Sequence, residues 1–186
     1  MRPLIAACLL TVSLAGCGSL PGTDDTPFVP AGVFGTYQDV DTGAMNVAAW
    51  DFASPANTRD NPAEVARAVV ALEYLPGELK HNPRWMDLDD AIVVHLERAR
   101  VQVRSVLGIK PDAPRQVVVN TMLALGLDLQ ARNQAAAMQV LASPIFTFPP
   151  EQTLRILSNL PYLKEANLAT ARAQAEAEQT TFAGHG

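Results

Sequence analysis

Proline, glycine and capping residues divide the chain from Asn61 onward into segments of helical length. Asn61-Pro62-Ala63-Glu64 is typical of a helix start, with Asn as the cap and Pro at the first helical position. A second helix is predicted from near Asp87, with Asp89 and Asp90 in its first turn, to a stop at Gly108. Further helix starts are predicted near Pro114, Asn133, Pro150 and Pro161. Apolar residues recur at helical spacing within these segments and no strand-like alternation is long enough for a sheet, so the predicted fold class is all-α.

The predicted architecture is a bundle of five to six helices. The first helix should end at Pro76-Gly77, and residues 117–129 are apolar enough to form the central core helix. The helices could also be grouped as three pairs, over residues 62–108, 114–142 and 150–179. Because a repeat array would show a regular period, which this chain lacks, an irregular bundle over residues 61–180 is favoured.

Residues 28–60 differ in composition from the helical part. They contain five of the eleven aromatic residues of the chain, which are Phe28, Phe34, Tyr37, Trp50 and Phe52. Since disordered segments are poor in aromatic residues, this segment is expected to pack against the helical body. Pro30, Gly32, Gly35 and Gly43 predict that it contains no long helix.

The first residues have the pattern of a secretory signal peptide. Arg2 precedes an apolar run over residues 4–14, which is shorter than the ~20 residues of a membrane span. Leu14-Ala15-Gly16-Cys17 then follows, and it resembles the lipobox of bacterial lipoproteins. The resemblance implies cleavage between Gly16 and Cys17 and acylation of Cys17. Residues 1–16 would then be removed. Residues 17–27 are polar and rich in Gly, Pro, Ser, Thr and Asp, which predicts a flexible tether. At the other end of the chain, residues 181–186 are predicted to be a disordered tail.

The same resemblance implies a location. Two or three acyl chains on Cys17 would hold an exported protein stably on a membrane. Gly18 follows the acylated residue, where Asp is associated with retention in the inner membrane of Gram-negative bacteria. The expected location is therefore the outer membrane, facing the periplasm, if the source is Gram-negative.

Composition excludes several classes of function. Cys8 would leave with the signal peptide and Cys17 would carry lipid, so the mature domain would have no free thiol or disulfide. Removal of Arg2 would leave 13 Lys and Arg against 19 Asp and Glu, a net charge of −6. That acidity argues against a nucleic-acid partner, which would need a basic surface.

No set of residues has the spacing of a metal site. Asp87, Asp89 and Asp90 lack the glycine and distant glutamate of a calcium loop, and helix capping explains them better. His95 falls at the edge of an apolar stripe, as a structural histidine would. The histidines do not share a helix turn, and they are His81, His95 and His185. No metal and no cofactor are therefore expected.

Signs of catalysis are also lacking. Glu73 lies in an apolar helix, where it should pair with an Arg or point to solvent rather than act as a general acid. The chain has no nucleophile motif, P-loop, dinucleotide fingerprint or haem motif, and no catalytic residue is predicted.

Trp50, Phe52 and Trp85 are the candidate contacts for a partner or ligand, although the interpretation of these aromatic residues as core is favoured. The predicted function is a non-catalytic, membrane-anchored helical module that binds a protein partner in the cell envelope. One alternative is a lipid or small-molecule binding protein with an apolar pocket walled by residues 28–52. The other is an enzyme of unrecognised type.

Replacement of Cys17 by Ala should abolish incorporation of radioactive palmitate, because the thiol that would accept the lipid is removed. Cells expressing the wild-type chain or the Cys17→Ala variant would be labelled and the immunoprecipitated protein counted. Equal labelling of the two proteins would refute the lipoprotein assignment.

Overall fold

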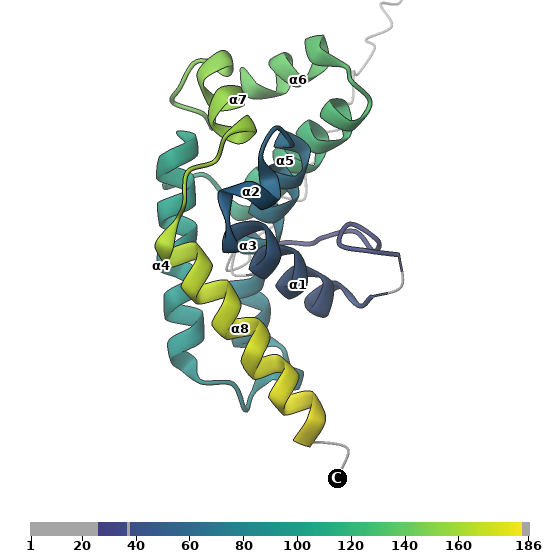
Figure 1. The fold of residues 1–186 in the computed structure, drawn as a ribbon, viewed down its shortest axis with the longest axis vertical. Coiled ribbons are helices and arrows are strands. Elements are labelled where there is room, and N and C mark those ends of the chain that lie inside the picture. The colour runs from purple at the N-terminus through teal and green to yellow at the C-terminus, as the bar shows by residue number, and fades with distance from the viewer. Residues whose placement is uncertain (1–25, 37, 184–186) are drawn as a thin grey trace, which may run out of the picture.

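The computed structural model describes residues 26–36 and 38–183, which form a helical bundle (Figure 1). In the described part of the chain there are eight α-helices and one 3₁₀ turn, and the all-α prediction is confirmed. The elements are α1 Val40–Ala53, α2 Pro55–Thr58, α3 Pro62–His81, η1 Pro83–Trp85, α4 Asp90–Leu107, α5 Arg115–Gln130, α6 Gln134–Leu141, α7 Pro150–Ser158 and α8 Lys164–Ala183.

The centre of the bundle is α3, which packs against α1, α4 and α5. Fourteen of its twenty residues are buried, including the continuous run from Ala68 to Gly77, as expected for a helix surrounded by others. The prediction that residues 117–129 form the central helix is wrong. Met122 and Leu125 of α5 are buried, but Val117 and Leu127 are exposed, because only one side of α5 is covered by neighbouring helices.

Local capping signals place the helix ends. The Asn61 side chain accepts a hydrogen bond from the Glu64 backbone N–H at the start of α3. Asp89 Oδ1 accepts one from the Ala91 N–H at 2.9 Å, so the capping interpretation is confirmed for Asp89; Asp90 lies in the first turn of α4 and Asp87 lies before the helix. Gly108 ends α4 with φ +70°, a left-handed conformation that favours glycine.

Two helix predictions need correction. α1 and α2 occupy most of the stretch in which no long helix was expected. Asp39 caps α1 by accepting a hydrogen bond from the Thr42 N–H at 3.0 Å. Gly43 lies inside α1 and Phe34 packs against it so closely that a Cβ at position 43 would be 2.7 Å from Phe34 Cβ, which explains the glycine. α3 also continues through Pro76 to His81, since its long buried surface outweighs the hydrogen bond that Pro76 cannot donate.

The N-terminal part of the described chain, residues 26–36, is not helical and lies on the bundle. Gln116 of α5 bonds both backbone groups of Phe28, accepting from its N–H at 2.7 Å and donating to its carbonyl at 3.0 Å. Val29 and Phe34 are buried in the common core. This segment therefore forms a wall beside α5.

The last helix, α8, packs along α1 and α4 through small side chains (Figure 1). Among the α8 side chains that the structure describes, which end at Gln179, the buried apolar residues are Ala166, Ala169, Ala173 and Ala177. Within residues 26–36 and 38–183, no helix is both long enough and apolar enough to cross a membrane.

Gly108→Ala should lower the free energy of unfolding by about 1 to 3 kcal/mol, because a side chain is disfavoured in the left-handed region. A Cβ at this position would also lie 2.5 Å from the Phe148 ring. Gly126→Ala in the interior of α5 is the matched control, since a Cβ there meets no atom closer than 3.8 Å. The control should be neutral or stabilising by about 0.5 to 1 kcal/mol. Urea unfolding followed by circular dichroism measures both, and equal losses would contradict the assignment.

Candidate functional site

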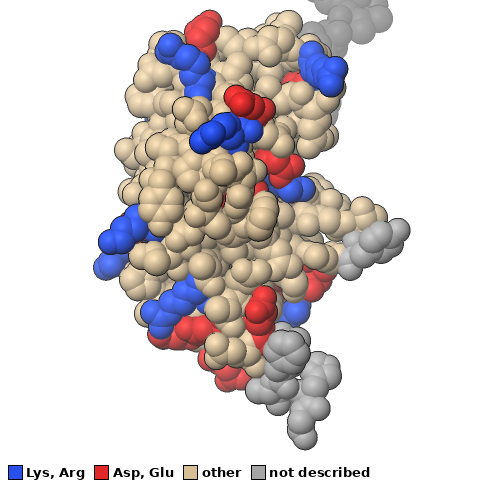
Figure 2. Space-filling model, viewed as in Figure 1, with Lys and Arg blue, Asp and Glu red and all other residues tan. Residues whose placement is uncertain are grey.

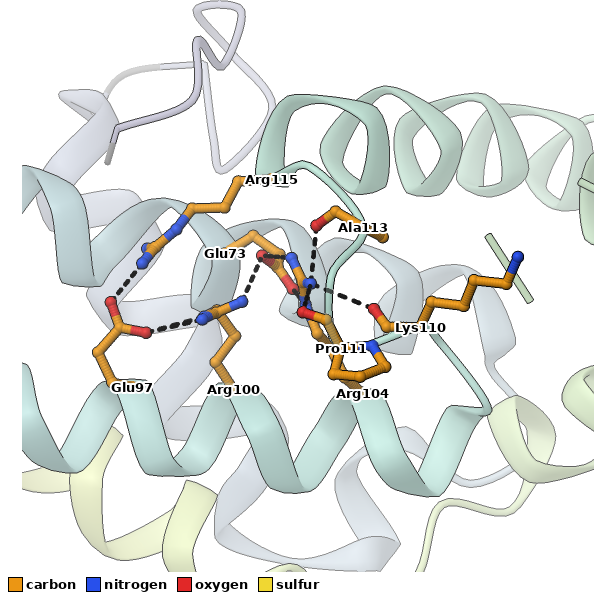
Figure 3. A network of polar contacts seen from close by, with 8 residues as sticks. All are labelled: Glu73, Glu97, Arg100, Arg104, Lys110, Pro111, Ala113 and Arg115. Carbon is orange, nitrogen blue, oxygen red and sulfur yellow. Dashed lines mark hydrogen bonds and ion pairs between the residues drawn. The ribbon is translucent and has the colours of Figure 1, made fainter. Parts of the chain in front are cut away.

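A buried ion pair joins α3 to α4. Both carboxylate oxygens of Glu73 accept from Arg104, from Nε at 2.6 Å and from Nη2 at 2.7 Å (Figure 3). Glu73 is 1% exposed and Arg104 is 2% exposed, so neither charge is solvated by bulk water. Such burial is tolerated only when the charges are paired and their remaining hydrogen-bonding groups are satisfied.

The third nitrogen of Arg104 fixes the loop between α4 and α5. Arg104 Nη1 donates to the backbone carbonyls of Lys110, Pro111 and Ala113, at 3.3, 3.0 and 2.8 Å (Figure 3). The guanidinium thus uses Nε, Nη1 and Nη2 within the protein. This arrangement makes Arg104 a structural clamp between α3, α4 and the loop.

A second set of ion pairs extends from this clamp toward the surface. Arg100 Nη1 lies 3.8 Å from Glu73 Oε2, and Arg100 Nη2 lies 2.9 Å from Glu97 Oε2. Arg115 of α5 also donates to Glu97 (Figure 3). Burial alone would raise the pKa of Glu97, but the hydrogen bond from Arg115 and the charge of Arg100 hold that pKa below its ordinary value. The network therefore joins α3, α4 and α5 by charge.

The chemistry of this network is that of a scaffold. Because Glu73 is buried and both of its oxygens accept hydrogen bonds from Arg104, no substrate can reach this carboxylate to exchange a proton. Among residues 26–36 and 38–183, no three His, Cys, Asp or Glu side chains cluster as metal ligands do. Glu73 is paired with an Arg, which is one of the two outcomes that the sequence left open.

A second buried carboxylate, Asp41, joins α1 to α3 and η1. Tyr74 Oη donates to Asp41 Oδ1 at 2.5 Å, and Trp85 Nε1 donates to Oδ2 at 3.0 Å. Burial and the nearby Asp41 carboxylate raise the pKa of the Tyr74 hydroxyl. Arg84 lies over the Trp85 ring, 4.5 Å from its centroid, and pairs with Asp39 at 3.0 Å. The polar groups of this cluster are thus satisfied by one another.

Asp51, near the end of α1, differs from the other buried acids. It is 4% exposed, and its Oδ2 has no hydrogen-bond partner. Burial and the charge of Glu64 raise the pKa of Asp51 to about 7, against an opposing effect of Arg67. Asp51 is therefore a buried acid whose charge changes near neutral pH.

One face of the molecule carries few charges. Figure 2 shows an area with few charged side chains across its middle, over α1 and α2. α1 and α8 are adjacent there, with Gln174 Nε2 donating to Asn46 Oδ1 at 2.9 Å. We call the exposed apolar residues at the end of α1 and in α2 the uncharged face, which comprises Trp50, Ala53 and Ala56. Exposed apolar surface, when it is contiguous, marks interaction sites in soluble proteins.

The three aromatic candidates lie in different environments. Trp50 is 66% exposed on the uncharged face, whereas Phe52 and Trp85 are buried. Trp85 still lines a pocket of about 360 Å³ between α1, η1 and α8, together with Arg84. The structure thus does not bring the three side chains into one site. Cys17, Gly16 and His185 lie outside the described residues.

Sequence reasoning missed the functional groups that depend on pairing between distant segments. Asp41 belongs to the stretch expected to be irregular, and nothing in its neighbourhood marks it as a buried acceptor. Asp51 gave a weak signal, since it follows Trp50 and precedes Phe52 in an apolar context. No protein-family model, no curated protein and no solved structure matches this chain.

Removing either partner of the buried pair should destabilise the folded protein. Glu73→Met and Arg104→Met should each lower the free energy of unfolding by about 3 to 5 kcal/mol, because each leaves one charge buried without a partner. The double variant should recover most of this loss. Arg172→Met, at the exposed pair with Asp89, is the control and should cost at most about 0.5 kcal/mol. Additive losses in the double variant, measured by urea unfolding, would contradict this account.

Asp51→Asn should stabilise the protein at high pH and not at low pH. The folded-state pKa of about 7 exceeds the ordinary value of 3.8, so this residue's contribution to stability falls as pH rises through 7. We expect a gain of about 1 to 3 kcal/mol at pH 8, declining toward zero by pH 4. Urea unfolding at several pH values measures the gain, with Asp112→Asn as a control for charge removal at an exposed position. A gain that is the same at pH 4 and pH 8 would refute the assignment.

Proposed function

We propose that this chain is an exported lipoprotein whose helical domain binds a protein partner in the cell envelope through the uncharged face. The domain carries out no chemistry of its own. The observation that carries this proposal is the exposure of Trp50, at 66%, on α1, a helix that lies under an area with few charged side chains in Figure 2. A large apolar side chain exposed to water favours a partner that covers it.

The buried charges support a binding role rather than catalysis. The carboxylates of Glu73 and Asp41 accept hydrogen bonds from other helices of the domain and so hold those helices together. A catalytic acid or base would instead face a cleft and leave a lone pair or proton available. The ion pairs give the domain the rigidity that a preorganised binding surface requires.

The proposed anchor contributes to affinity. Acyl chains on Cys17 would confine the domain to a membrane surface, together with any partner that resides there. Confinement raises the effective concentration of the partner, so a modest surface suffices for binding. The uncharged face is accordingly proposed to act on a membrane-associated protein.

A photo-crosslinking amino acid at position 50, in cells that make the full chain, tests this proposal. We expect one discrete cross-linked product, because the partner covers Trp50. The control is the same amino acid at position 127, since Leu127 is 67% exposed but lies on α5. Introduction of Trp50→Asp with the probe at position 56 should reduce the product about 30-fold, as for loss of a central aromatic contact of ~2 kcal/mol. Absence of a product at position 50, or the same products at 50 and 127, would overturn the proposal.

A further inference from the structure

One long stretch of α5 and the N-terminal segment beside it carry no charge. Residues 116–127 contain no charged side chain, and neither do residues 26–36. We call the exposed apolar side chains of these two segments the α5 face, which comprises Phe28, Pro30, Ala31, Val117, Ala124 and Leu127. Phe28 exposes 74% of its surface and Leu127 exposes 67%. Large apolar side chains exposed together favour a surface that covers them.

Two contacts hold the segments of the α5 face together. At one end, Gln116 bonds both backbone groups of Phe28. At the other end, residues 31–33 line a groove together with Leu127. The exposed apolar residues of α5 follow one another at intervals of seven and three residues, which places them on one side of the helix. The α5 face is therefore built from both segments, side by side.

The polar side chains of this part of α5 make hydrogen bonds within the domain. Gln116 uses its amide oxygen and its amide nitrogen on Phe28, and its Nε2 also donates to Asn120 Oδ1 at 2.9 Å. Thr121 Oγ1 donates to the Val117 carbonyl at 2.8 Å. These internal bonds lower the free-energy cost of moving the surface out of water. The α5 face therefore suits a lipid surface, which has few hydrogen-bonding groups below its headgroups.

The charged residues that border the α5 face do not form a basic patch. Arg115 and Asp128 lie at the two ends of the uncharged stretch of α5, and Arg115 is paired with Glu97. Arg67, in the neighbouring groove, is paired with Glu64. Attraction to anionic headgroups needs a cluster of Lys or Arg, so contact here would depend on insertion of apolar side chains. A zwitterionic bilayer is therefore the lipid surface that this face fits.

The proposed lipid on Cys17 brings a bilayer to this side of the domain. Phe28 lies eleven positions after Cys17, and eleven residues span at most about 40 Å when fully extended. That reach is comparable to the diameter of a domain of this size, which is about 40 Å. A face on the other side of the bundle would therefore meet the bilayer only if the tether were stretched around the domain. The α5 face, in contrast, begins where the tether ends.

We propose that the α5 face lies against the bilayer that holds the Cys17 acyl chains, with Phe28, Val117 and Leu127 inserted at its interface. This inference rests on the anchor proposed above. Phe and Leu side chains are typical of the apolar side of helices that lie in a membrane interface. The tether keeps the face close to the bilayer, so a weak apolar contact is enough to orient the domain. Trp50, on α1, lies outside the α5 face and stays available to a protein partner.

Electron paramagnetic resonance tests the proposal, since it measures the depth of a nitroxide side chain at a chosen position. The full chain, acylated in cells and purified, is reconstituted in phosphatidylcholine vesicles with the nitroxide at Ala124 or, as the matched control, at Ala171. Both are exposed helical alanines, but Ala171 lies on α8, which packs on α1 and α4. We expect the ratio of oxygen to nickel-chelate collisions to be about threefold higher at position 124, because apolar oxygen concentrates in lipid and the chelate stays in water.

Charged substitutions on the face distinguish insertion from mere proximity to the bilayer. Phe28→Asp and Leu127→Asp should each lower the ratio at position 124 to about the value at position 171, because a carboxylate resists transfer out of water. Leu168→Asp is the matched control and should leave the ratio unchanged, since Leu168 is 55% exposed and lies on α8. Circular dichroism verifies that each variant folds, and two positions keep the test decisive if one variant does not.

Each other outcome overturns the proposal. Equal ratios at positions 124 and 171, or an unchanged ratio in both aspartate variants of the face, would show that it is not inserted. An equal fall with Leu168→Asp would show an effect of charge at any position. Low collision rates with both reagents at position 124 would show that protein covers the face, as a second copy or a partner. A purified chain whose mass lacks acyl groups on Cys17 would refute the anchor itself, which keeps that failure distinct from failure of the α5 face.

Discussion

Glu73 and Arg104 form the contact on which the arrangement of the bundle depends. The pair joins the central helix to α4, and the remaining guanidinium nitrogen holds the loop after α4 through three backbone carbonyls. That loop in turn pairs with the segment before α7, where the Lys110 N–H donates to the Ile145 carbonyl at 2.8 Å and the Thr147 N–H to the Gly108 carbonyl at 2.7 Å. One buried ion pair therefore helps to fix the relative positions of three parts of the chain, which are α3, the end of α4 with its following loop, and the segment before α7. Such a pair adds little net stability over apolar side chains of the same shape, but it penalises any packing that separates the charges.

The division of the candidate aromatic residues follows from helical geometry. Trp50 and Phe52 are two residues apart in α1, and two residues of an α-helix differ by about 200° around its axis. One must therefore face outward when the other faces the core, as is observed. Without the prediction of a helix over residues 40–53, their phase could not be assigned from the sequence. Trp85 is buried because Asp41, 44 residues away in the chain, accepts its indole hydrogen bond.

Much of the fold could be predicted because helix ends are local features. Asp89 and Gly108 mark the ends of α4 through interactions within a few residues, and the sequence shows both. Glycine usually disfavours a helix, but Gly43 lies inside α1 because the absence of a side chain there makes room for Phe34. The pairing of Glu73 with Arg104 spans 31 residues, and no periodicity in the sequence specifies which arginine a buried acid will meet. Contacts between distant segments were therefore the part that local patterns could not supply.

The burial of α8 mainly through alanine side chains has a consequence for the motions of the domain. Burial of methyl groups removes little apolar area from water per residue, so α8 is held less strongly than α3, whose buried residues include Leu72 and Leu75. Segments with small buried area open at low free-energy cost, in cooperative units smaller than the whole domain. The backbone amides of α8 would then exchange with deuterium before those of α3. Because α8 packs against α1, which carries Trp50, its opening and closing would set how often α1 is fully supported on that side.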